Sequence, residues 1–123
     1  MNRAFTNILC DNVETNARFY EDILDMHRRN DFGWFIIMGS DDLPGLELGL
    51  LDKAHETVPP VVAQPPAGLI LTFVVEDVAV CHRKAVAEKA EIVEEPTDLP
   101  YGQTRLLLRD PAGTIVDISS PTP

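Results

Sequence analysis

Two carboxylates occupy positions from which they could do chemistry. Glu47 lies within residues 46–51 and Asp117 within residues 114–118, and the side chains of both segments alternate as in half-buried strands. Each acid stands where such a strand normally places an apolar side chain. Two carboxylates in one cavity would repel each other, so that the pKa of one rises or a cation sits between them. We therefore predict that Glu47 and Asp117 are catalytic residues, unless a one-residue slip of register turns both toward solvent.

The first half of the chain predicts one strand, one helix and three further strands. A capping box of Asp11 and Glu14 begins the helix, and helical spacing of apolar residues continues through Asp25. Alternating side chains predict strands over residues 3–9 and 46–51. A short polar segment predicts an edge strand over residues 27–30, and a run that is apolar on both faces predicts a strand over residues 34–38.

The second half predicts the same order of elements. Asp77 caps its helix, and the last two strands are joined by a tight turn at residues 110–113. The strands are predicted over residues 69–75, 91–94, 104–109 and 114–118. Between the halves, residues 53–68 contain two Pro-Pro pairs and no periodicity, which predicts a connector that is neither strand nor helix.

Similar separations along the chain relate the two halves. Asn12 and Asp77, which precede the two helices, are 65 residues apart. On the first strands, the same separation aligns Phe5 with Ile70, and Asn7 with Thr72. In the hairpins, a separation of 70 residues aligns Glu47 with Asp117. The sequence therefore predicts a single α+β domain over residues 1–123, with module one at about 1–52, a connector at about 53–68 and module two at about 69–120.

Charge and composition exclude some partners. Ten basic and twenty acidic side chains give a net charge of −10, which repels nucleic acid and anionic membranes and favours either dispersal in water or a cationic ligand. Cys10 and Cys81 lie far apart and fit two reduced, buried thiols. No signal peptide or apolar run of membrane-spanning length is present, so we expect a cytoplasmic protein.

Two groups of residues carry a family resemblance. They are Asn12-Val13-Glu14, Phe19-Tyr20 and Ile23-Leu24 early in the chain, and Tyr101-Gly102-Gln103 and Arg109-Asp110-Pro111-Ala112-Gly113 late in it. With the duplicated order of elements, the chain resembles the vicinal oxygen chelate superfamily, which includes glyoxalase I, fosfomycin-resistance enzymes, extradiol dioxygenases and bleomycin-resistance proteins. The resemblance implies two tandem βαβββ modules that form a curved mixed sheet around a cleft, usually in a homodimer.

The resemblance also implies where a metal would bind. The family's ligand positions fall on Phe5, Glu47, Ile70 and Asp117 of this chain. Phe5 and Ile70 carry no ligand atom, so we expect no cofactor. Oxygen atoms of Asn7 and Thr72 would complete only a weak divalent site that favours Mg²⁺ or Ca²⁺. The histidines lie outside the strands that would face the cleft, and we interpret them as surface or boundary residues: His27, His55 and His82.

A further set of residues could line a pocket. Aromatic side chains would supply its walls, Tyr101 would lie at its rim, and Arg105 would pair with Glu47 or Asp117 or meet an anionic substrate. The predicted ligand-binding residues are Phe5, Asn7, Trp34, Ile70, Thr72, Tyr101 and Arg105.

Three functions remain open at this point. The first is a metal-free protein that binds a small-molecule ligand, as bleomycin-resistance proteins do. The second is a glyoxalase-like lyase or isomerase in which Glu47 or Asp117 takes a proton next to a carbonyl group, with a weakly bound divalent metal. The third is a domain that only dimerises with a partner protein. We rank binding first and catalysis second.

Overall fold

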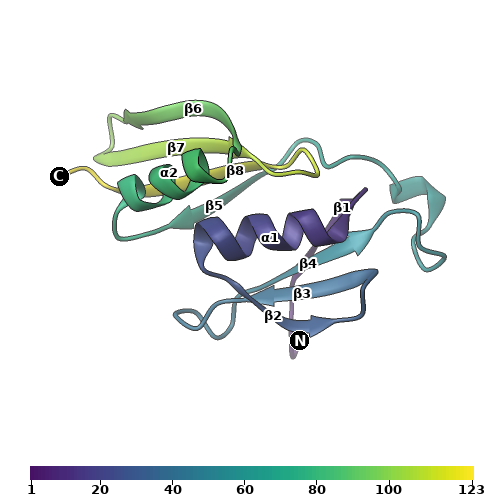
Figure 1. Cartoon of the computed structure of the whole chain (residues 1–123). Helices are drawn as coiled ribbons and strands as arrows, with labels where there is room; N and C mark the ends of the chain where they lie inside the picture. The colour runs from purple at the N-terminus through teal and green to yellow at the C-terminus, as the bar shows by residue number, and fades with distance from the viewer. The chain divides into compact units, whose positions relative to one another are not determined.

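The computed structural model describes all 123 residues as two compact units, Met1–Pro66 and Ala67–Pro123 (Figure 1). Each unit contains one helix and one four-stranded mixed sheet, in the order strand, helix, strand, strand, strand. The predicted α+β fold of two βαβββ modules is confirmed. The boundary between the units falls within the predicted connector, which contains one short 3-10 helix, η1 (Pro60–Val62), where no helix was predicted. Its first turn carries a proline, a residue that fits the start of a helix because no backbone donor is needed there.

Unit one places its helix on one face of its sheet. The elements are β1 (Thr6–Cys10), α1 (Val13–Leu24), β2 (His27–Asp31), β3 (Phe35–Gly39) and β4 (Glu47–Asp52). The strand order is β1-β4-β3-β2, with β1 parallel to β4 and the other pairs antiparallel. The predicted edge position of residues 27–30 is confirmed by β2.

None of the helices in the chain has the length and apolar character needed to span a membrane.

The core of unit one lies between α1 and this sheet. Alternate strand residues that are at most 4% exposed form the sheet side of it: Ile8, Cys10, Ile36, Met38, Leu48 and Leu50. The helix contributes Ala17, Tyr20 and Ile23, which are equally buried. Because side chains alternate across a strand, the residues between these positions, such as Asn7, Phe35 and Glu47, lie on the opposite, open face of the sheet.

Helix α1 begins at a different cap from the predicted one. The N-cap is Asn12, whose Oδ1 accepts a hydrogen bond from the backbone N–H of Thr15 at 3.1 Å. The predicted capping box of Asp11 and Glu14 is therefore wrong. The extended backbone of Asn12 puts its short side chain over the first free N–H groups of the helix, whereas the Asp11 carboxylate lies beside Lys53.

Replacing Asn12 with alanine should lower the free energy of unfolding by about 1 kcal/mol, the usual cost of losing a side-chain cap. Urea denaturation of the full chain measures this loss. Asn30→Ala is the matched control, because Asn30 is exposed on the edge strand β2 and caps nothing. Equal losses in the two variants would contradict a capping role.

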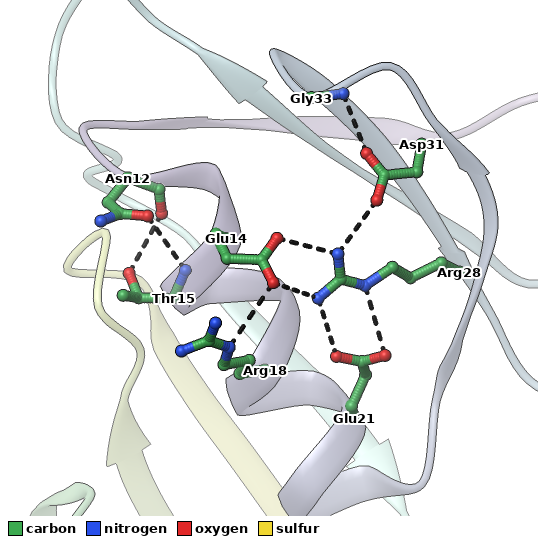
Figure 2. Close-up of polar contacts among 8 residues, drawn as sticks. All are labelled: Asn12, Glu14, Thr15, Arg18, Glu21, Arg28, Asp31 and Gly33. Carbon is green, nitrogen blue, oxygen red and sulfur yellow. Dashed lines mark hydrogen bonds and ion pairs between the residues drawn. The ribbon is translucent and has the colours of Figure 1, made fainter.

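A cluster of charges links α1 to the edge strand β2 (Figure 2). The guanidinium of Arg28 on β2 donates to Glu14 at 2.8 and 2.9 Å and to Glu21 at 3.0 and 3.3 Å, both on the helix. It also donates to Asp31 at 3.0 Å, and Arg18 lies 3.5 Å from Glu14. These contacts hold Arg28 as a cation, because all three carboxylates raise its pKa. One arginine therefore joins the helix to a strand that has a sheet neighbour on one side only.

Unit two repeats the arrangement. Its elements are β5 (Ile70–Val74), α2 (Val78–Ala87), β6 (Glu91–Asp98), β7 (Gln103–Arg109) and β8 (Ile115–Pro121), with strand order β5-β8-β7-β6. The predicted cap is confirmed, because Asp77 accepts from the N–H of Ala79 at 2.9 Å. The predicted end of the strand at residue 94 is wrong, since β6 continues past Pro96 to Asp98. Its pairing with β7 shifts register between Glu94 and Thr97, and a sheet edge tolerates a proline that cannot donate.

The pairing registers correct the alignment of the two halves. In unit one Asn7 on β1 lies opposite Gly49 on β4, whereas in unit two Thr72 on β5 lies opposite Asp117 on β8. The counterpart of Asp117 is therefore Gly49, and the predicted match between Glu47 and Asp117 is wrong by two residues. A shift of two keeps side chains on the same face, so Glu47 still lies on the open face of its sheet.

Candidate functional site

The open face of unit one is shaped by a residue without a side chain. A Cβ atom added at Gly49 would overlap Oδ1 of Asn7 and lie 3.0 Å from Cε1 of Phe35. The missing side chain therefore leaves room for the Asn7 amide and the Phe35 ring to come together above β4. The predicted ligand-binding residue Asn7 is exposed at this point.

Five rings form one connected group that includes Phe35, and we call them the aromatic cluster: Phe5, Phe32, Trp34, Phe35 and His55. Phe35 is central, with ring centroids of Phe5, Trp34 and Phe32 at 6.4, 5.8 and 6.5 Å. Trp34 stacks on His55 at 3.6 Å with an interplanar angle of 6°. Phe5 is 38% and Phe32 60% exposed. The cluster therefore offers accessible ring surface on which a planar molecule could stack.

The sequence predicted part of this cluster. Phe5 and Trp34 were predicted to bind ligand, and the structure brings both into contact with Phe35. The contribution of His55 was missed, because it lies in the turn after β4, where no periodicity indicates a neighbour. Its Nδ1 lies 2.9 Å from Oγ1 of Thr57, which orients the ring. Phe32 was also missed, and its backbone N–H donates to the carbonyl oxygen of Phe35 in the turn that precedes β3.

Glu47 lies beside the aromatic cluster and forms ion pairs with two arginines. Its side chain is 14% exposed, and Arg3 donates to it from Nη2 at 2.6 Å and from Nε at 2.9 and 3.1 Å. Nη1 of Arg29 lies 3.5 Å from the same carboxylate. The hydrogen bond from Arg3 is the main reason that the pKa of Glu47 falls below its usual value. The pKa of Glu47 is thus lowered and not raised, because a cation from 44 residues away in the sequence reaches it.

Both arginines are placed by their neighbours. The Arg3 guanidinium lies over the ring of Phe5, with Cζ 5.2 Å from the ring centroid. Arg29 lies against β3 at Gly39, where a Cβ atom would overlap its Nε atom, and its Nη2 donates to the carbonyl oxygen of Ser40 at 3.3 Å. One positioned cation, Arg3, therefore borders the aromatic cluster at Phe5, and Arg29 shares the Glu47 carboxylate with it.

The second carboxylate has neutral partners. Asp117 on β8 accepts from Oγ1 of Thr72 at 3.1 Å and from Oγ of Ser119 at 2.5 Å. The structure thus brings the predicted residues Thr72 and Asp117 together. Within unit two, Arg105 does not pair with Asp117 and instead lies 3.1 Å from Glu94 on the neighbouring strand β6. A contact of Arg105 with Glu47 or with an anionic substrate stays a prediction.

The other predicted residues of unit two, Ile70 and Tyr101, are both exposed. Ile70, at the start of β5, is 60% exposed, and Tyr101, in the turn between β6 and β7, is 70% exposed. Glu47 belongs to unit one and Asp117 to unit two. That the two acids share one cavity therefore stays a prediction.

The donor set does not fit a metal. Phe5 and Ile70 carry no ligand atom, and Gly49 supplies none at the counterpart of Asp117. No three His, Cys, Asp or Glu side chains gather as a metal site requires. The histidines have other neighbours, with His27 beside Asp41 and His82 beside Glu95.

Comparison with known proteins places the chain among relatives of the same architecture. Residues 3–118 match the family model described as Glyoxalase/Bleomycin resistance protein/Dioxygenase superfamily. A glyoxalase-related enzyme from Fulvimarina pelagi has a TM-score of 0.81 and 20% identity, over 98% of this chain and 88% of that one. A glyoxalase/bleomycin resistance protein/dioxygenase family enzyme from Burkholderia phytofirmans PsJN has a TM-score of 0.78 and 16% identity, over 95% and 96%. No curated protein matches the chain.

Proposed function

The chain belongs to the Glyoxalase/Bleomycin resistance protein/Dioxygenase superfamily, and we propose that within it this protein binds a small organic molecule without a metal. The binding surface is the aromatic cluster of unit one. The observation that carries this proposal is a connected group of five rings, two of them over a third exposed, whose central member Phe35 lies against a glycine. Exposed stacked rings commonly mark a surface for a planar ligand.

The state of the carboxylates supports binding over catalysis. A general base works best when its pKa lies near the working pH. The pKa of Glu47 is instead lowered by Arg3, and its oxygens are already held by two guanidinium groups. A glyoxalase-like lyase or isomerase would therefore depend on Asp117, whose partners are hydroxyl groups. The homodimer and the cytoplasmic location stay predictions from the sequence.

Calorimetric titration of the full chain tests this proposal. We expect the neutral planar probe 2-naphthalenemethanol to bind, with the same affinity before and after treatment with a chelator. Parallel titrations with Zn²⁺, Ni²⁺ and Mg²⁺ should show no tight site. Tight binding of a transition metal together with no binding of the aromatic probe would overturn the proposal. Turnover of a glyoxalase substrate that disappears in Asp117→Asn would favour the enzyme instead.

A further inference from the structure

The charges beside Phe5, at one edge of the aromatic cluster, oppose the net charge of the chain as a whole. The net charge of −10 by itself favours a cationic ligand. Near the cluster, Glu47 is the one carboxylate within ion-pair distance of Arg3 or Arg29. Two guanidinium groups against one carboxylate leave a net positive charge in this group of three, beside the ring of Phe5. A cationic ligand would be repelled there, because a nearby charge acts more strongly than a distant, solvent-screened one.

Arg29 supplies a fixed part of this charge. Gly39 allows its guanidinium to lie directly against β3, and the side chain is only 24% exposed. Its hydrogen bonds to Ser40 and Glu47 hold it in place. A cation that is already ordered loses little conformational freedom when a ligand binds.

Arg3 supplies the accessible part. Its side chain is 53% exposed and its bonds to Glu47 use Nε and Nη2, which leaves the donors of Nη1 for another acceptor. The guanidinium lies over Phe5, whose ring stacks on Phe35. An accessible donor therefore stands at the edge of the ring surface.

We propose, building on the proposed function, that the ligand is a planar aromatic anion. Its ring stacks on the exposed part of the aromatic cluster, and its anionic group, such as a carboxylate, accepts hydrogen bonds from Nη1 of Arg3. A guanidinium fits a carboxylate in both charge and shape, and the neighbouring Arg29 adds to the attraction. Glu47 limits the affinity, because its charge opposes that of the ligand.

Three probes that share one ring system test the preference for charge. They are 2-naphthoate, 2-naphthalenemethanol and 2-naphthylmethylammonium, each titrated into the full chain by calorimetry at neutral pH. We expect the naphthoate to bind roughly tenfold more tightly than the alcohol, since hydrogen bonds to a charged group add about that much. The ammonium probe should bind most weakly.

Variants of the two paired residues assign the effect to Arg3. Arg3→Gln should weaken the naphthoate roughly tenfold and leave the alcohol unchanged. This change also leaves Glu47 without its main partner, so weaker binding could come from the lost cation or from the unpaired carboxylate. The double variant Arg3→Gln with Glu47→Gln separates these two effects, and it should still bind the naphthoate weakly. Glu47→Gln alone should strengthen naphthoate binding. Arg18→Gln, an exposed arginine on α1, is the control and should change nothing.

The outcomes separate this inference from the proposed function. Ammonium or alcohol binding as tight as the naphthoate would overturn the inference and leave the proposed function standing. Equal weakening of all three probes by Arg3→Gln would also overturn it, because Arg3 would then act by packing on Phe5. Failure of every probe to bind would overturn the proposed function itself.

Discussion

Replacing Trp34 with alanine should lower the affinity for 2-naphthalenemethanol by roughly tenfold or more, since stacking of a planar ligand on an aromatic side chain typically contributes that much. Trp34 contacts three other members of the aromatic cluster, with its ring 3.6 Å from that of His55, 5.8 Å from that of Phe35 and 6.4 Å from that of Phe32. Its removal takes away ring surface and also the support that orders its neighbours. Calorimetric titration of the variant measures the loss.

Two comparisons make this prediction specific. Trp34→Phe keeps a ring at the position and should retain most of the affinity. Tyr101→Ala removes a ring that is 70% exposed in unit two, and it should leave the affinity unchanged if the aromatic cluster of unit one is the site. Unchanged binding by Trp34→Ala, in a variant whose urea denaturation remains cooperative, would exclude the aromatic cluster as the binding surface.

Replacing Arg28 with methionine should lower the free energy of unfolding by about 2 kcal/mol, because three carboxylates lose the cation that holds them together. The Arg28 side chain is 22% exposed, so water can compensate only in part. Its bonds to Glu14 and Glu21 join β2 to α1 (Figure 2). Methionine keeps the apolar part of the side chain. The decrease in the free energy of unfolding therefore reflects the loss of the charge. Urea denaturation at neutral pH measures it.

Arg18→Met is the matched control for Arg28→Met. Arg18 pairs with Glu14 alone, at 3.5 Å, and its side chain is 64% exposed, so we expect a loss below about 0.5 kcal/mol. A loss in Arg28→Met no larger than that of the control would show that the cluster of carboxylates does not stabilise the fold.

The pH dependence of stability gives a second measurement on the same cluster. The pKa of Glu14 is lowered chiefly by its hydrogen bond from Arg28, and that of Asp31 chiefly by the N–H of Gly33 and then by Arg28. A carboxyl group whose pKa is lowered in the folded state stabilises the fold at pH values above the pKa that it has in the unfolded chain, which is 4.5 for Glu14. This contribution to stability is lost as the pH falls below that value. The unfolding free energy of the wild type should therefore fall below about pH 4.5 more steeply than that of Arg28→Met. Parallel profiles would contradict the assignment to Arg28.

The sequence by itself determined the elements and their duplication. Alternation of side chains is a property of neighbouring residues, which is why the strands were found to within a few residues. The cap at Asp77 is equally local, since its side chain reaches a backbone N–H only two residues away. Local chemistry also has limits, because Asp11 and Asn12 both suit a helix cap and only the backbone conformation selects Asn12.

Only the tertiary structure decided what the candidate site contains. The pairing of β1 with β4 and of β5 with β8 put Gly49, and not Glu47, at the counterpart of Asp117. The contact of Arg3 with Glu47 and the stacking of His55 on Trp34 join residues that are far apart along the chain. Such contacts depend on how strands align and where loops fold back, and no periodicity within one segment encodes them. The sequence therefore determined which side chains were available, and the folded sheet decided which of them meet.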